Sequence, residues 1–319
     1  MTALDQLSGW PASNAEAGWT TPDGRGARTS GAERPFPLAS VTKPLAAYAV
    51  LVAVEEGTLA LDQPAGPPGS TIAHLLAHAS GLGEDPDTPL AAPGRRRIYS
   101  NAGFDVLGAE LARAAGMSAA DYIGEAVAEP LGLSATALHG PSPAKDGVST
   151  VADLLKLGLE WLAPTLVDPT TLALATSPWL PDLVGVLPGF GRQDPNPWGL
   201  GFEIRGHKHP HWTGAANSPA TFGHFGRSGT FLWVDPSRRL VCCALSDEPF
   251  GPWAALAWPA LADGVIAFSP GEFFTAVGKS ATWVRDSIGT LACPVFLVSS
   301  ESEATACCAS ASKGRSACS

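Results

Sequence analysis

The chain has 319 residues, of which 45% are hydrophobic and 16% are charged, and its net charge is −10. This apolar content is enough for a large buried core and excludes an intrinsically disordered chain, which needs low hydrophobicity and high charge. The acidic excess argues against a nucleic-acid partner and against an anionic membrane surface, because proteins that bind either one present basic patches.

The first half of the chain predicts one long apolar helix followed by several shorter helices. Short strand-like pieces are expected over residues 10–35, around an Asp23-Gly24 turn signal. A loop then leads into an apolar helix within residues 35–56, and Gly57 is a typical residue at a helix end. Further helical patterns, separated by Pro and Gly, lie at 71–78, 103–115, 119–128 and 150–162.

The second half is expected to be richer in strands. Residues 178–197 form a Pro- and Gly-rich loop region, and a final helix is expected over about 251–268. The predicted strands between them are W-G-L-G-F-E-I, G-T-F-L-W-V-D and R-R-L-V-C-C-A-L-S, all within residues 198–246. A helix-rich middle and a strand-rich end predict an α+β fold with an antiparallel sheet and a mostly helical insertion.

One domain is expected over residues 1–268, followed by a tail. Its α/β part would comprise about 1–69 and 196–268, and its helical part about 70–195. Residues 269–319 carry four acidic and four basic side chains, so the net charge belongs to the rest of the chain. Their end is rich in Ser, Ala and Cys without hydrophobic periodicity, which predicts a disordered low-complexity tail.

Targeting signals and disulfide or zinc patterns are not recognisable. The N-terminus lacks a signal-peptide pattern, and no run of about 20 apolar residues could span a membrane, so we expect a cytoplasmic protein. Cys242 and Cys243 are adjacent in a predicted strand and would point to opposite faces. The other four cysteines form no C-x-x-C pair. No G-x-G-x-x-G follows a strand, and we expect neither a metal nor another cofactor.

Lys43 is an unusual residue in its surroundings. It is one of six lysines, and it lies in P-L-A-S-V-T-K-P-L-A-A-Y-A-V-L-V-A-V, where no other charge occurs between Arg34 and Glu55. A buried lysine costs several kcal/mol unless it is paired or has a lowered pKa. Because Pro44 suits the first turn of a helix, Ser40 is expected near the helix start, within reach of Lys43 on the same face. A hydroxyl beside a desolvated amine is one way to activate a serine nucleophile.

Two later segments strengthen this interpretation. Tyr99-Ser100-Asn101 is expected in a loop just before a helix, and His224-Phe225-Gly226 just before a strand. The ordered set S-V-T-K, Y-S-N and H-F-G resembles the signature of the serine β-lactamase and penicillin-binding-protein superfamily. It is most similar to the branch with class C β-lactamases, D-alanyl carboxypeptidases, D-aminopeptidases and related esterases. The segment L-L-A-H-A-S-G-L at 75–82 is similar to L-L-T-H-T-S-G-L of that branch.

The resemblance implies a β-lactamase-like fold and a role for each residue of the three boxes. Ser40 would attack a carbonyl carbon, and either Lys43 or Tyr99 would take its proton. Asn101 would bind Lys43 and a substrate amide. The backbone N–H groups of Ser40 and Arg227 would form the oxyanion hole. Gly226 would let the backbone approach the ligand closely, and His224 would border the substrate.

His224 departs from the lysine that usually begins the third box. With a reference pKa near 6.5, it is expected to be incompletely charged at pH 7 and to gain its proton as the pH falls from 8 to 6. The attraction for substrate carboxylates would then be weaker than with lysine. We therefore expect a carboxylesterase that acts on a small-molecule ester. A D-amino-acid peptidase or amidase, a β-lactamase and a D-alanyl-D-alanine carboxypeptidase are the alternatives, and a catalytically silent peptide-binding or scaffold relative is the alternative of another class.

Other polar clusters favour structural roles. His74 and His78 have the spacing of a zinc helix, but the Glu of H-E-x-x-H is missing, and His78 matches the structural histidine of the family segment. The loop with His207, His209 and His211 is expected to be solvated. Residues 95–97, three arginines, are expected in a surface loop. No G-x-S-x-G elbow is present, which argues against an α/β-hydrolase. The sequence carries no signal for an oligomeric state.

Overall fold

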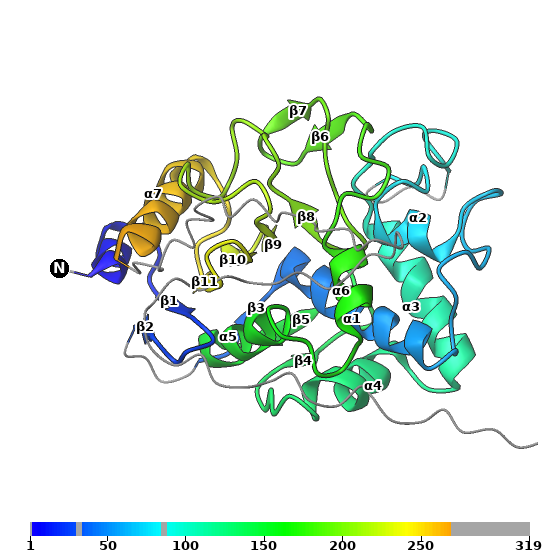
Figure 1. Cartoon of the computed structure of the whole chain (residues 1–319), viewed down its shortest axis with the longest axis horizontal. Coiled ribbons are helices and arrows are strands. Elements are labelled where there is room, and N and C mark those ends of the chain that lie inside the picture. The colour runs from blue at the N-terminus through cyan, green and yellow to red at the C-terminus, as the bar shows by residue number, and fades with distance from the viewer. Residues whose placement is uncertain (1, 30–33, 84–87, 269–319) are drawn as a thin grey trace, which may run out of the picture. The chain divides into compact units, whose positions relative to one another are not determined.

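A computed structural model describes residues 2–29, 34–83 and 88–268, and its centre is a six-stranded antiparallel sheet (Figure 1). The strand order is β2 (Gly26–Arg28), β1 (Ala15–Thr20), β11 (Leu240–Ser246), β10 (Thr230–Asp235), β9 (Phe222–Gly226) and β8 (Glu203–Ile204). Strands from both ends of the described chain therefore join in one sheet, and the helices between them cover it. The predicted α+β fold, an antiparallel sheet with a mostly helical insertion, is confirmed.

Each face of the sheet contributes to a separate hydrophobic cluster. Helix α5 (Val151–Glu160) packs against β1, β10 and β11 on one face, and α7 (Pro252–Phe268) belongs to the cluster on the other face with the 3₁₀ helix Ala3–Gly9. Leu232 and its partner Cys243 belong to the first cluster, and Trp233 and its partner Cys242 to the second. Successive strand side chains alternate between faces, so the two cysteines point apart, as predicted.

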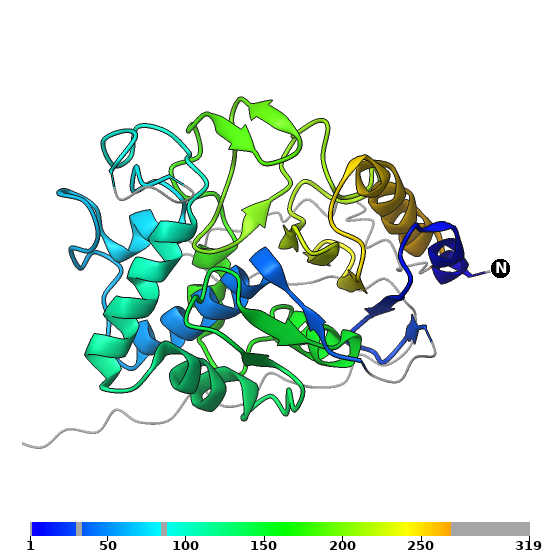
Figure 2. The same cartoon turned by 180° about the vertical axis from the view of Figure 1, so that it is seen from behind.

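Helix α1 (Thr42–Glu55) is buried along most of its length, which explains its apolar sequence. Its residues from Thr42 to Ala53 are all buried. It contacts α3 (Asn101–Ala115), α4 (Ala119–Ile123) and the π-helical turn Gly124–Ala128 that continues α4 (Figure 2). A helix that is apolar on all sides belongs in the interior of a domain. The lysine at its start is therefore buried by the same packing.

The remaining predicted helices form close to their expected positions because their caps are present. Thr71, Ser100 and Thr150 each accept a backbone N–H bond at the start of α2 (Ile72–Leu76), α3 and α5. Gly116 ends α3 in the left-handed conformation, with φ of 70°. The short helix α6 (Pro169–Ala175) was missed, although Asp168 caps it and Pro169 occupies its first turn.

Short strands account for the other differences from the sequence-based prediction. The expected loop region 178–197 contains the hairpin of β6 (Gly185–Leu187) and β7 (Gly191–Gln193). A further small sheet joins β3 (Phe36–Pro37), β5 (Gly147–Ser149) and β4 (Ala137–Leu138). Such strands are too short to show a period of two. The strand predicted over 198–204 is reduced to β8. His224-Phe225-Gly226 comes before a strand, β10, as predicted, and also lies within a strand of its own, β9.

The prediction for residues 269–319 concerns a part of the chain that lies outside the described residues. Helix α7 spans Pro252–Phe268, up to the last described residue, so the predicted boundary stays a prediction. Within the described ranges, no helix is both long and apolar enough to cross a bilayer.

Candidate active site

Ser40 and Lys43 of one motif and Tyr99 of another meet at one oxygen atom. The Tyr99 hydroxyl donates to Ser40 Oγ over 2.6 Å, and Lys43 Nζ donates to the same oxygen over 3.3 Å. Ser40 and Lys43 come from one turn of the chain, whereas Tyr99 lies 59 residues beyond Ser40. The contact between S-V-T-K and Y-S-N is thus made by the tertiary structure.

The turn that carries Ser40 is held in an uncommon backbone conformation. Ser40 lies in a 3₁₀ turn, Ala39–Val41, which leads directly into α1. Ala39 has a φ of 45°, in the left-handed region that non-glycine residues rarely adopt. The Thr42 hydroxyl donates to the Ala39 carbonyl over 2.6 Å and accepts from the Gly147 N–H over 3.0 Å. These bonds fix the strained turn and the direction of Ser40.

The hydrogen bonds of Lys43 leave one position of its amine for Ser40. Lys43 Nζ donates to Asn101 Oδ1 over 2.6 Å and to the Ala144 carbonyl over 2.9 Å. Neither oxygen carries a proton, so two N–H groups are committed to them in either protonation state. The remaining tetrahedral position faces Ser40 Oγ. There an ammonium donates a proton, and a neutral amine offers a lone pair to the serine hydroxyl.

Asn101 therefore lies where the resemblance expects it, but the Ala144 carbonyl was missed. Every residue has a main-chain carbonyl oxygen, so the sequence gives no signal for which one accepts a hydrogen bond from Lys43.

Tyr99 is held by the residues that precede α3. The Ser100 N–H donates to His78 Nδ1 over 3.1 Å, and the Ser100 hydroxyl caps α3 by accepting from the Gly103 N–H. The ring of His78 lies 4.7 Å from that of Tyr99 and 4.6 Å from that of Trp198, between centroids. Burial, with the nearby charge of Lys43, lowers the His78 pKa well below its usual value. A neutral His78 is thus a structural support for Tyr99, as its sequence context suggests.

Arg97 corrects the prediction of a surface loop. Arg95 and Arg96 are exposed, but Arg97 is only 2% exposed. Its guanidinium donates to the backbone carbonyls of Ala77, Trp179, Leu180 and Asn196. These acceptors belong to segments far apart in the sequence, so Arg97 fastens them together beside Tyr99. Sequence reasoning failed here because all four partners are main-chain oxygens.

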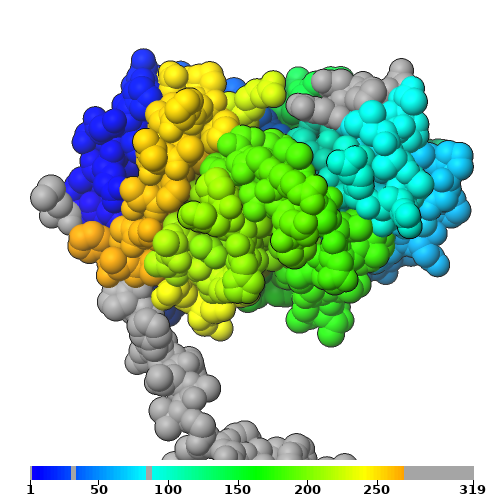
Figure 3. Space-filling model, turned by 90° about the horizontal axis from the view of Figure 1, so that it is seen from above, coloured from blue at the N-terminus to red at the C-terminus, as the bar shows by residue number. Residues whose placement is uncertain are grey.

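A pocket of about 540 Å³ opens above Ser40. In the view from above, the loop region around β6 and β7, in green, lies between α7 and the segment that precedes α3 (Figure 3). The turn of that hairpin forms one wall of the pocket. The polar lining residues are Ser40, Tyr99, Glu203, His224 and Arg227, and the others are Leu187, Pro188, Gly189, Trp198, Phe225, Pro249 and Phe250. A largely apolar pocket with a few convergent polar groups is typical of a small-molecule site.

His224 lines this pocket in an uncharged form. Its Nδ1 lies 2.6 Å from the Phe225 carbonyl oxygen and must therefore carry the ring proton. Burial of the ring, with the positive charge of Lys43, lowers the His224 pKa to about 3. The expectation that His224 gains its proton between pH 8 and 6 is therefore wrong, because the site desolvates the ring. The weakened attraction for carboxylates persists over that whole range.

Gly226 and Arg227 follow His224 on the same segment and approach the chain next to Ser40. A Cβ atom on Gly226 would overlap the Leu38 carbonyl oxygen and crowd the Thr230 hydroxyl. Gly226 thus permits a close approach of two backbone segments, and its approach to a ligand stays a prediction. Arg227 lines the pocket together with Ser40. Its exposed side chain brings a permanent cation to the pocket, which the sequence analysis did not consider.

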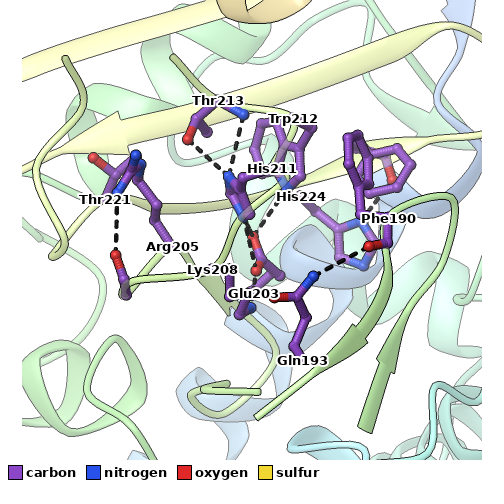
Figure 4. A network of polar contacts seen from close by, with 12 residues as sticks. Phe190, Gln193, Glu203, Arg205, Lys208, His211, Trp212, Thr213, Thr221 and His224 are labelled. Atoms are coloured by element: carbon purple, nitrogen blue, oxygen red, sulfur yellow. Dashed lines mark hydrogen bonds and ion pairs between the residues drawn. The ribbon is translucent and has the colours of Figure 1, made fainter. Parts of the chain in front are cut away.

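A buried cluster around Glu203 forms another part of the pocket wall (Figure 4). Glu203 accepts from Lys208, from His211 Nε2 over 3.1 Å and from Trp212 Nε1 over 2.9 Å. Burial opposes ionisation of Glu203, but the charge of Lys208 and the bonds from His211 outweigh it and hold the Glu203 pKa below its usual range. The prediction of a solvated loop is wrong for His211, which is buried, whereas His207 and His209 are exposed.

The family is decided by comparison with known proteins. The model of the β-lactamase family matches residues 3–265 of this chain. The chain belongs to the β-lactamase family. This assignment confirms the resemblance drawn from the three boxes, and the described part of the chain has the corresponding mixed fold.

Three relatives illustrate the range of this β-lactamase-family fold. A protein described as a β-lactamase from Mycobacterium bovis is 52% identical, with a TM-score of 0.82, covering 84% of this chain and 99% of that one. Esterase EstB from Burkholderia gladioli is 37% identical over 145 residues, which span 31% of this chain and only 37% of the esterase. The hydrolase EstCE1, described as having promiscuous acyltransferase activity, shares the fold at 19% identity and a TM-score of 0.68, covering 82% of this chain and 96% of that one.

Proposed function

We propose that this protein is a serine hydrolase that cleaves a small neutral ester through an acyl-enzyme on Ser40. The observation that carries the proposal is the convergence of Lys43 Nζ and Tyr99 Oη on Ser40 Oγ beside a pocket. A nucleophile with a proton acceptor in hydrogen-bond reach is the signature of covalent catalysis by serine.

The proposed reaction has two steps. Ser40 Oγ attacks the ester carbonyl carbon and passes its proton to Lys43 or Tyr99, and the negative charge gathers on the carbonyl oxygen. The N–H groups of Ser40 and Arg227 would stabilise that oxygen, an effect worth about 10²–10³ in rate for each donor. The alcohol leaves with a proton from the same acid–base pair. Water then attacks the acyl group on Ser40, and release of the carboxylic acid restores the serine.

The pocket favours uncharged substrates. Its wall is largely apolar, and His224 is neutral where a lysine would present a cation. The esterase relative supports an ester bond. The permanent cation of Arg227 is exposed, so solvent and salt weaken its attraction for a carboxylate.

Hydrolysis of β-lactams is the second candidate, because the Mycobacterium bovis relative is described as a β-lactamase. A carboxylate-bearing β-lactam would have to bind through Arg227 rather than through His224. The two candidates therefore differ in which residue controls the rate.

The test has two stages. A fluorophosphonate probe with mass mapping should label Ser40, and Ser40→Ala should remove the label. Turnover should then be compared on short-chain nitrophenyl esters, D-amino-acid peptides and amides, and β-lactams. We expect the esters to have the highest kcat/KM. No labelling of a folded protein would contradict the proposal and would support a silent relative. Efficient β-lactam turnover that is lost in Arg227→Gln would support the second candidate.

A further inference from the structure

The His224 ring of the third box lines the pocket and carries a hydrogen-bond acceptor. His224 Nδ1 is committed to the Phe225 carbonyl oxygen at 2.6 Å, and a carbonyl oxygen can only accept. In the neutral ring the other nitrogen, Nε2, then carries a lone pair and no proton. A lysine at this place would offer only donors, so the polarity of the wall is reversed.

This lone pair has no protein donor within the described residues. His224 Nε2 is buried and makes no hydrogen bond, although the ring is part of the pocket wall. Its aromatic neighbours, Tyr99 at 5.8 Å and Trp198 at 5.4 Å between ring centroids, pack against the ring. Buried acceptors without a partner are uncommon and call for an explanation, such as a ligand that supplies the missing donor.

The nearby charged groups do not supply that donor. Glu203 lines the same pocket as His224 but is occupied by Lys208, His211 and Trp212 (Figure 4). His211 accepts from the Thr213 N–H through Nδ1, so its single proton lies on Nε2 and points to Glu203. The groups of this cluster thus hydrogen-bond to one another, and none of them donates to His224 Nε2. This atom can therefore accept a hydrogen bond from a substrate.

We propose that His224 selects substrates with a hydroxyl or amide N–H group that donates to its Nε2 atom. This inference rests on the proposed esterase function and names the substrate class more narrowly as hydroxylated or amide-bearing esters. A carboxylate or an ether oxygen placed at Nε2 would face a lone pair without a proton between them. The preference for the donor group should reach at least about tenfold in kcat/KM, which corresponds to about 1.4 kcal/mol.

Matched pairs of esters test the proposal on both sides of the scissile bond. Nitrophenyl hydroxyacetate and nitrophenyl 3-hydroxybutyrate are compared with their methoxy counterparts. The monoacetates of ethylene glycol and 1,3-propanediol are compared with the acetates of the corresponding methoxy alcohols, using acid release. The wild type should prefer the hydroxyl member of at least one pair. No preference in any pair would overturn the inference.

Variants at His224 assign the preference to its acceptor. His224→Phe keeps an aromatic ring without an acceptor and should abolish the preference, and His224→Gln, whose amide oxygen can accept, should retain part of it. His224→Lys should favour hemisuccinate esters instead. The same change at an exposed histidine, His207→Phe, should leave the preference intact. If His224→Phe does not fold, the contrast between the Gln and Lys variants decides. A preference that survives in the Lys variant would overturn the proposal.

Failure of this inference can be told apart from failure of the proposed function. Labelling of Ser40 and turnover of nitrophenyl acetate would establish the esterase independently of any hydroxyl. An active esterase without a hydroxyl preference contradicts only the role of His224. A folded protein that neither labels nor turns over acetate contradicts the proposed function itself.

Discussion

Two lysines, Lys43 and Lys208, are both buried but have opposite surroundings. Lys43 donates to neutral oxygens of Ser40, Asn101 and Ala144. Lys208 is paired with the carboxylate of Glu203, and its Nζ lies 5.7 Å from the centroid of the Trp198 ring. Both side chains are buried. Among the contacts described, a buried opposite charge is a partner of Lys208 but not of Lys43.

The difference shows that the partner of a buried lysine amine determines whether the amine can take part in proton transfer. Burial lowers the pKa of Lys208 to about 8, and the Glu203 carboxylate opposes this loss of the proton, because a neutral Lys208 would leave Glu203 as a buried anion without its counter-charge. Serine is a neutral partner whose own proton can move, so the Lys43 site can exchange a proton with its neighbour. The same residue type thus supports structure at one place and offers chemistry at the other.

The largest expected effect is on activity at the Lys43 site. Ser40→Ala and Lys43→Met should each lower kcat/KM for nitrophenyl acetate by at least about 10³-fold, and the double variant should be no worse, because the residues act as a unit. Melting temperatures should stay near that of the wild type for Ser40→Ala. Lys156→Met is the control, because Lys156 is exposed and does not line the pocket. Turnover by purified Lys43→Met near the wild-type rate would contradict the assigned roles.

Stability should respond more at the Lys208 site. Lys208→Met leaves Glu203 as a buried charge without its main partner, and breaking such a pair typically costs about 3–5 kcal/mol. Chemical denaturation should therefore show a large loss in the free energy of unfolding. Adding Glu203→Gln removes the stranded charge and should restore part of the loss. If Lys208→Met alone is as stable as the wild type, the ion pair does not stabilise the fold.

A substitution at Gly226 tests how tightly the Ser40 segment is held. Gly226→Ala would place a methyl group against the Leu38 carbonyl, two residues before Ser40. Overpacking of this kind typically costs about 1–3 kcal/mol. We expect a lower melting temperature together with reduced kcat, because the nucleophile must move with Leu38. Gly9→Ala is a suitable control, since a Cβ there meets open space. Unchanged kcat in Gly226→Ala would show that the segment adapts.

The last predicted effect is absent at neutral pH and grows only as the pH falls: a pH dependence of stability that comes from buried neutral histidines. Burial lowers the pKa values of His78, His211 and His224, the last to about 3. Below about pH 6.5 the unfolded chain binds protons that the folded histidines do not, so the free energy of unfolding falls as the pH falls. Each of these histidines lowers the free energy of unfolding by up to about 1.4 kcal/mol per pH unit.

The pH range separates these histidines from the Glu203 ion pair. The lowered Glu203 pKa gives stability that is present above the unfolded carboxyl pKa and is lost only in strong acid. Denaturation series between pH 6.5 and 4.5 should thus report mainly the histidines. His224→Phe should flatten the dependence, and His207→Phe should not. An unchanged slope in His224→Phe would mean that His224 is protonated in the folded protein.

The sequence by itself determined the fold family, the main helices and the candidate reactive residues. These follow from local rules: S-x-x-K places Ser40 and Lys43 on one turn, an apolar segment predicts a buried helix, and capping residues mark helix starts. The order of the three boxes was specific enough to identify the family. The structure brings residues of all three boxes together around Ser40 and the pocket, as the resemblance implied.

Only the tertiary structure decided the chemical state of the site. The partners of Arg97 lie up to 99 residues away and are main-chain oxygens, which residue types do not reveal. Glu203 and Lys208 are close in sequence, yet their burial depends on the loops and strands that enclose them. The proton position on His224 is set by one carbonyl and by desolvation of the ring. Burial and hydrogen-bond partners are properties of the assembled core, and they determine whether a polar side chain is charged, paired or available to a substrate.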